Sequence, residues 1–187
     1  MINDLTYLGS LLGRVFLISK TENLNEWNGN EENLNGESDY DLISNFISYE
    51  EGDLSIFNKS INLSLLIYFS MSSKVEIFSK TNSLILCDGL YFNNSLNNLR
   101  QIKLKLIEEL EFKTRIENNE LVIFDAAIEG KRVLENTNEG VFKIINDDFN
   151  SGSLINLTNG IYSTKRIEVN IIFDNQEVSL KGIEISL

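Results

Sequence analysis

The chain has 187 residues, a length that suits one domain able to bury its own core without disulfide or metal cross-links. Its hydrophobic fraction of 42% and aromatic fraction of 10% exclude an intrinsically disordered chain. The 28 acidic and 16 basic residues leave a net charge of −12, which excludes nucleic acid and anionic membranes as partners, because both require a basic surface.

The N-terminal segment carries no basic region followed by an apolar core, so we expect no secretion signal. No run of 18 uncharged apolar residues occurs, and we expect no transmembrane helix. The single cysteine, Cys87, lies in an apolar run and has no partner for an intramolecular disulfide. These features predict a protein of the reducing cytoplasm.

Short runs of β-branched and aromatic residues, bounded by Asn, Gly, Asp and Ser, predict strands along most of the chain. In 61–69 apolar residues alternate with other residues, which indicates a half-buried strand. The other expected strands are 14–19, 40–49, 54–57, 75–78, 84–87, 121–124 and 141–145. We therefore expect a mainly β (α+β) fold, an antiparallel β-sandwich or a strongly curved sheet, in a single domain covering residues 1–187.

Residues 21–38 are rich in Asn, Glu and Gly and are expected to form a surface loop. This loop contains the only tryptophan, Trp27. A tryptophan in a polar loop is either an anchor for a partner or the cover of a small hydrophobic cluster. Both interpretations of Trp27 stay open at this point.

One segment has helical spacing: Leu96, Leu99, Ile102, Leu106 and Leu110 recur every three or four residues. We predict an amphipathic helix over about 95–110, packed on one face of the sheet. The run Ile102-Lys103-Leu104-Lys105-Leu106 also alternates as a strand does, which is the competing interpretation.

The C-terminal residues predict a β-hairpin, because 167–173 alternate, 174–177 supply turn residues, and Val178 and Leu180 begin a return strand. Further on, Ile183 and Ile185 have the opposite parity. We expect a β-bulge at Gly182 to absorb the change.

The absence of histidine removes the commonest general base, the usual partner in catalytic triads and the most frequent transition-metal ligand. A single cysteine cannot build a structural zinc site, and Gly9 to Gly13 lack the lysine of a phosphate-binding loop. We expect no catalytic, cofactor-binding or metal-binding residues.

Carboxylates are the remaining candidates for chemistry. On a strand, Asp39 and Asp41 would project from one face, as a hydrolase pair or metal ligands do, although a solvated turn explains them as well. Asp147 and Asp148 indicate a turn. Asp125 follows a buried strand, and we expect it to accept backbone N–H groups at a corner, with a partner-facing anion as the alternative.

Several short motifs occur in a fixed order: Trp27-Asn28-Gly29, Ser38-Asp39-Tyr40-Asp41, Phe124-Asp125-Ala126-Ala127 with Gly130, and Gly140-Val141-Phe142. In this order the chain resembles the immunity protein 21 family of bacterial polymorphic toxin systems. Members of that family carry a Gly-Gly-Pro near the N-terminus, whereas this chain has Leu12-Gly13-Arg14 and no proline, so the resemblance does not extend to the entry of the first strand.

The resemblance implies a cytoplasmic, non-enzymatic protein that binds and neutralises a cognate toxin by direct contact. If the toxin acts on nucleic acid, as a nuclease does, its basic cleft would complement the acidic surface of this chain. The expected contact residues lie in and after the polar loop: Trp27, Glu31, Glu32, Glu37, Asp39 and Asp41. The alternatives are a structural, self-associating β module, a carboxylate-dependent hydrolase, and a charge that serves only solubility.

Overall fold

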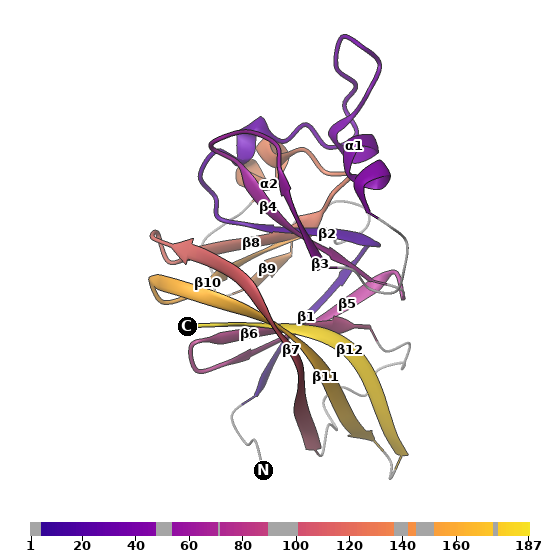
Figure 1. Cartoon of the computed structure of the whole chain (residues 1–187), viewed down its shortest axis with the longest axis vertical. Coiled ribbons are helices and arrows are strands. Elements are labelled where there is room, and N and C mark those ends of the chain that lie inside the picture. Colours follow the sequence, from indigo (N-terminus) through magenta and orange to yellow (C-terminus); the bar gives the residue numbers. More distant parts are fainter. Residues whose placement is uncertain are drawn as a thin grey trace.

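The computed structural model describes residues 5–47, 54–70, 72–89, 101–136, 142–144, 152–173 and 176–187. These residues form two antiparallel β-sheets of six strands each, two α-helices and one short 3-10 helix. The sheets pack against each other, and the helices lie on the far side of one of them (Figure 1). The expected mainly β, sandwich-like fold is confirmed. No helix in the described ranges is long and apolar enough to cross a membrane.

The first sheet, sheet A, contains the longest strands. Its spatial order is β1 (Thr6–Leu12), β5 (Lys74–Lys80), β6 (Ser83–Asp88), β12 (Gln176–Ser186), β11 (Gly160–Phe173) and β7 (Gln101–Ile116). The second sheet, sheet B, has the order β3 (Leu54–Asn58), β4 (Ser64–Phe69), β2 (Val15–Ser19), β8 (Glu120–Asp125), β10 (Gly152–Asn156) and β9 (Phe142–Ile144). β1 and β10 are strands that the sequence analysis did not predict.

The main core lies between the two sheets. It takes alternate residues from several strands of both sheets, for example Val75 and Ile77 of β5 and Leu66 and Tyr68 of β4, all of them buried. Alternate positions on a strand point to opposite faces, so the intervening residues must find other partners. In β4 and β5 these intervening residues are buried as well, so both faces of these two strands are covered.

A helical cap covers the outer face of sheet B. It consists of η1 (Leu24–Glu26), α1 (Asp39–Phe46) and α2 (Gly130–Asn136), which pack on Leu65, Ile67 and Phe69 of β4 and on neighbouring strands. All residues from Leu65 to Phe69 are consequently buried. The strand predicted over 61–69 is confirmed for 64–69, but the half-burial predicted for it is wrong. Ile61 is 104% exposed and precedes the strand.

The helix predicted over about 95–110 is wrong for 101–110, which belong to β7; residues 95–100 lie outside the described residues. β7 pairs with β11 from Gln101 to Ile116. Its charged side chains, which a helix would align with one another, instead form ion pairs across the two strands, with N–O distances of 3.1 to 3.8 Å. Pairing with a strand distant in sequence decides the conformation, because local helical preference amounts to only tenths of a kcal/mol per residue.

The C-terminal hairpin of β11 and β12 is confirmed, but the bulge predicted at Gly182 is wrong. The register of β12 runs without a shift through Gly182, which pairs with Ile167 on one side and Cys87 on the other. The change of parity has another cause. Val178 and Leu180 pack on the face of sheet A that points away from sheet B, whereas Ile183 and Ile185 enter the core between the sheets.

A buried carboxylate lies on this far face of sheet A. Glu76 is fully buried, and its Oε2 accepts a hydrogen bond of 2.9 Å from the hydroxyl of Tyr7. Its Oε1 lies 2.6 Å from Nζ of Lys74, which supplies the compensating charge. The surrounding cluster is otherwise apolar and includes Cys87.

The stability of the fold is expected to fall in alkaline solution. Burial, followed by the charge of Glu76, raises the pKa of Tyr7 from 10.0 to about 12. Since the folded protein holds this proton more tightly than the unfolded chain, the contribution is complete below pH 10 and is lost as the pH rises toward 12. For this half-buried phenol we expect a loss of roughly 1–2 kcal/mol after solvent screening is taken into account.

Urea unfolding at a series of pH values measures this effect. Tyr7→Phe should flatten the alkaline fall in the free energy of unfolding, and the slope that remains reflects Tyr68, Tyr162 and Cys87, whose pKa values are also raised by burial. An unchanged slope in Tyr7→Phe would contradict the assignment.

Candidate partner-binding surface

Trp27 lies inside the helical cap, with 1% of its surface exposed. Its Nε1 donates a hydrogen bond of 3.1 Å to the carbonyl oxygen of Ala126. Phe57 approaches the indole edge-on with 6.5 Å between ring centroids, and Nζ of Lys59 lies 5.6 Å from the ring centroid. Trp27 therefore holds the cap together, in the packing role that the sequence had left open.

The turn that follows Trp27 is attached to the corner after β8. The amide of Asn30 donates to the carbonyl of Ala127 over 3.1 Å, and the amide of Gly130 donates to the carbonyl of Trp27 over 2.8 Å. Gly29 has φ +58, and a Cβ atom there would lie 2.6 Å from the carbonyl oxygen of Ala127. Only glycine fits this left-handed, closely packed position.

The strand predicted over 40–49 is wrong for 40–47, because Asp39–Phe46 form helix α1; residues 48 and 49 lie outside the described residues. Ser38 caps this helix: its Oγ accepts from the amide of Asp41 over 3.0 Å, and Oδ2 of Asp41 accepts from the amide of Ser38 over 3.1 Å. This reciprocal capping box favours a helix start over a strand. The hydrogen bonds from Ser38 lower the pKa of Asp41.

Asp39 and Asp41 do not face a common site. Asp39 is 7% exposed; it accepts a hydrogen bond of 2.6 Å from the amide of Asn28 and forms an ion pair with Lys59. Asp41 is exposed and bonded to Ser38. Among the described residues, no group of three carboxylate, cysteine or histidine side chains lies close enough to hold a metal ion. The geometry gives the hydrolase alternative no support.

Residues 30–37 form a projecting loop at the cap end of the molecule (Figure 1). Asn33 organises it: its amide donates to the carbonyl of Glu37 over 2.9 Å, and its Oδ1 accepts from the amide of Asn35 over 2.8 Å. A bridge between Glu32 and Ser38 closes the base. At the tip Leu34 is 107% exposed.

The outer face of α1 continues this surface. Leu42 and Phe46, one helical turn apart, are 38% and 51% exposed. Glu31, Glu32 and Glu37 in the projecting loop are exposed, as is Asp41 at the start of the helix. The segment 27–47 contains five carboxylates and no lysine or arginine. We call the projecting loop and the exposed face of α1 the cap surface; it offers apolar side chains among negative charges.

Asp125 has the structural role expected of it. Its Oδ1 accepts a hydrogen bond of 2.8 Å from the amide of Ala127 at the corner after β8. Burial raises its pKa, and backbone hydrogen bonds oppose that rise. Asp147 and Asp148 lie outside the described residues.

Of the expected contact residues, Glu31, Glu32, Glu37 and Asp41 lie on the cap surface, whereas Trp27 and Asp39 lie beneath it. Leu34 was not singled out from the sequence, since an isolated apolar residue in a polar loop carries no periodic signal. Leu42 and Phe46 were not singled out because they fell in the strand predicted over 40–49. The comparisons of this protein with protein-family models, curated proteins and solved structures gave no match. The function must therefore be inferred from the chain's own residues and geometry.

Proposed function

We propose that this is a cytoplasmic immunity protein, which binds a cognate toxin of a polymorphic toxin system and neutralises it by direct contact through the cap surface. The observation that carries the proposal is Leu34, fully exposed at the tip of an internally hydrogen-bonded loop and flanked by exposed carboxylates. Ordered presentation of a large apolar side chain suits insertion into a pocket of a partner.

The charge of the cap surface suits a basic partner. A toxin that acts on nucleic acid, such as a nuclease, has a cleft built for phosphates, and exposed carboxylates complement such a cleft and accelerate association. The buried contacts of Trp27 and Asp39 support this interpretation because they hold the loop base and α1 in place before the partner arrives. Binding to a preordered surface loses less conformational entropy.

The motifs behind the family resemblance also support the proposal. Three of them, at 27–29, 38–41 and 124–127, meet in one hydrogen-bonded network at the base of the cap surface. In the fourth, Phe142 begins β9, while Gly140 and Val141 lie outside the described residues. The first three motifs thus form a scaffold for the loop.

Affinity purification of the tagged protein from its native lysate, followed by mass spectrometry, tests the proposal. We expect near-stoichiometric recovery of one large multidomain protein with a C-terminal toxin module. Purified toxin module should then lose its activity when this protein is added. Recovery of this chain alone would argue against the proposal.

Reversing the loop charges should slow the association. The triple variant Glu31→Lys, Glu32→Lys, Glu37→Lys is expected to lower the association rate constant by roughly tenfold or more at low salt, with a smaller difference at high salt. Stopped-flow or surface-plasmon-resonance kinetics would measure it. Leu34→Ala should act mainly on the dissociation rate.

The matched control is Glu117→Lys, Glu135→Lys, Glu177→Lys, three exposed carboxylates outside the cap surface. Each triple adds six charges to −12, so both variants carry −6. Equal losses in the two variants would show that overall charge, not the cap surface, governs binding.

Self-association is the second candidate, because β7 is a 16-residue edge strand with Leu106 and Ile107 more than half exposed. However, β7 has two more residues than β11 between the pairs Lys113–Ser163 and Glu109–Lys165. Such bulges and charged side chains oppose edge-to-edge pairing. We expect a monomer in sedimentation velocity; a stable oligomer without a second protein would favour this alternative.

A further inference from the structure

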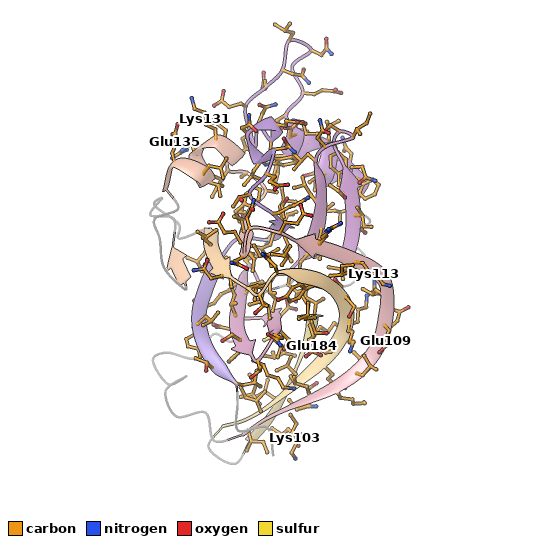
Figure 2. The ribbon with its side chains drawn as sticks, turned by 90° about the vertical axis from the view of Figure 1, so that its left-hand side faces the viewer. Lys103, Glu109, Lys113, Lys131, Glu135 and Glu184 are labelled. Carbon is orange, nitrogen blue, oxygen red and sulfur yellow. The ribbon has the colours of Figure 1, made fainter. Side chains whose placement is uncertain are left out.

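A groove with a cationic rim lies where β7 of sheet A crosses strands of sheet B. Its volume is about 410 Å³, and Ile18 of β2, Ile56 of β3 and Leu66 of β4 contribute apolar side chains to its lining. Lys20, Lys113 and Arg115 line it as well. Figure 2 shows Lys113 on β7, beyond Glu109 along the strand. This groove shares no residue with the cap surface.

The charge of the groove is opposite to that of the chain. Three of its nine lining residues are cationic and none is acidic, although acidic residues outnumber basic ones by 28 to 16 in the sequence. Chance would favour carboxylates at such a site. An acidic protein that gathers cations around an apolar floor creates a local site for a negative charge.

The cations are available to a ligand. Lys113 forms no ion pair with any residue in the described ranges. Lys20 lies 3.3 Å from Glu22, and Arg115 lies 2.8 Å from Glu117, but the side chains of both cations are substantially exposed. Exposed ion pairs of this kind are weak and exchange readily for another anion.

We propose that this groove binds a small amphipathic anion, a phosphate or carboxylate group carried on an apolar or aromatic body. The apolar floor takes the body, and the exposed cations Lys113 and Arg115 at the rim take the anion. The volume falls within the range of small-molecule sites, which combine apolar walls with a few polar groups. The site is independent of toxin binding, since it uses other elements.

A pair of probes that differ in charge tests the proposal. The anion 8-anilinonaphthalene-1-sulfonate should bind saturably to the full chain in a fluorescence titration. The uncharged N-phenyl-1-naphthylamine should bind with an affinity at least about tenfold lower. In methyl-labelled protein, the NMR signals of Ile18, Ile56 and Leu66 should shift. Equal binding of the two probes, or shifts elsewhere in the molecule, would overturn the proposal.

Charge reversal locates the anion. The double variant Lys113→Glu, Arg115→Glu should lower the affinity for the sulfonate probe by about tenfold. The control variant Lys103→Glu, Lys131→Glu changes two exposed lysines outside the groove (Figure 2) and should leave this affinity within roughly twofold of the unmodified protein. Circular dichroism would verify that both variants fold. Similar affinities for the two variants would overturn the proposal.

Competition identifies the head group. Displacement of the probe by adenosine monophosphate would assign a phosphate ligand, and displacement by octanoate would assign a carboxylate. Failure of both at millimolar concentration would overturn the proposal.

Discussion

Replacing Trp27 with alanine is expected to lower the free energy of unfolding by about 3–5 kcal/mol, the range for removing a large buried aromatic side chain. The indole is 1% exposed, and its removal would leave a cavity among Phe57, Leu24 and Ile43. It would also leave the carbonyl of Ala126 without its donor. Urea unfolding followed by circular dichroism measures the loss, because the variant lacks the only tryptophan.

Two companion variants make the result specific. Trp27→Phe retains most of the packing but not the N–H donor, so a loss of about 1–3 kcal/mol is expected. Leu34→Ala removes a fully exposed side chain and should change stability by less than roughly 0.5 kcal/mol. If Trp27→Ala were as stable as Leu34→Ala, the packing of the cap as described would be wrong.

Replacing Asp39 with alanine is expected to cost about 2–4 kcal/mol, because it leaves Lys59 without its counter-ion and the amide of Asn28 without its acceptor. The side chain of Lys59 is 19% exposed and that of Asp39 8%. The cost lies somewhat below that of a fully buried pair, since Lys59 can turn toward solvent. Thermal or urea unfolding at neutral pH measures it.

A double-mutant cycle separates the ion pair from the other contacts of Asp39. If the pair carries the effect, Lys59→Met combined with Asp39→Ala should cost less than the sum of the single changes. Glu37→Ala, at an exposed carboxylate two residues earlier, is the control and should be near neutral. Strict additivity would contradict a coupling between Asp39 and Lys59.

These buried contacts divide the candidate contact residues into two kinds. Changes at Trp27 and Asp39 should weaken the binding of a partner indirectly, because they loosen the base of the loop and α1. Unfolding experiments should detect these changes as a loss of stability. Changes at Glu31, Glu32, Glu37 and Leu34 should alter binding kinetics while stability stays nearly constant. Measuring both quantities on one set of variants therefore distinguishes support of the surface from contact with the partner.

Much of the fold follows from local patterns in the sequence. Six of the expected strands, at 14–19, 54–57, 75–78, 84–87, 121–124 and 141–145, coincide with observed strands to within a residue or two, because β-branched runs between turn residues have few other stable states. The C-terminal hairpin is likewise readable from alternation and turn chemistry. So is the corner at Asp125, where a carboxylate after a buried strand needs donors and finds the amide of Ala127.

Tertiary structure decided the rest, because one residue pattern is compatible with several environments. The segment from Ile102 to Leu110 fits a helix and a strand, and only β11 beside it selects the strand. Val178 packs on the face of sheet A that points away from sheet B, whereas Ile183 and Ile185 pack in the core between the sheets. Apolar residues therefore switch from one face of β12 to the other without a bulge. Composition by itself determined a packed, acidic protein, and the short apolar runs between turn residues determined that it is mainly β. The burial of Trp27 and Asp39 depends on chain segments some 20 to 100 residues away, which no local pattern reports.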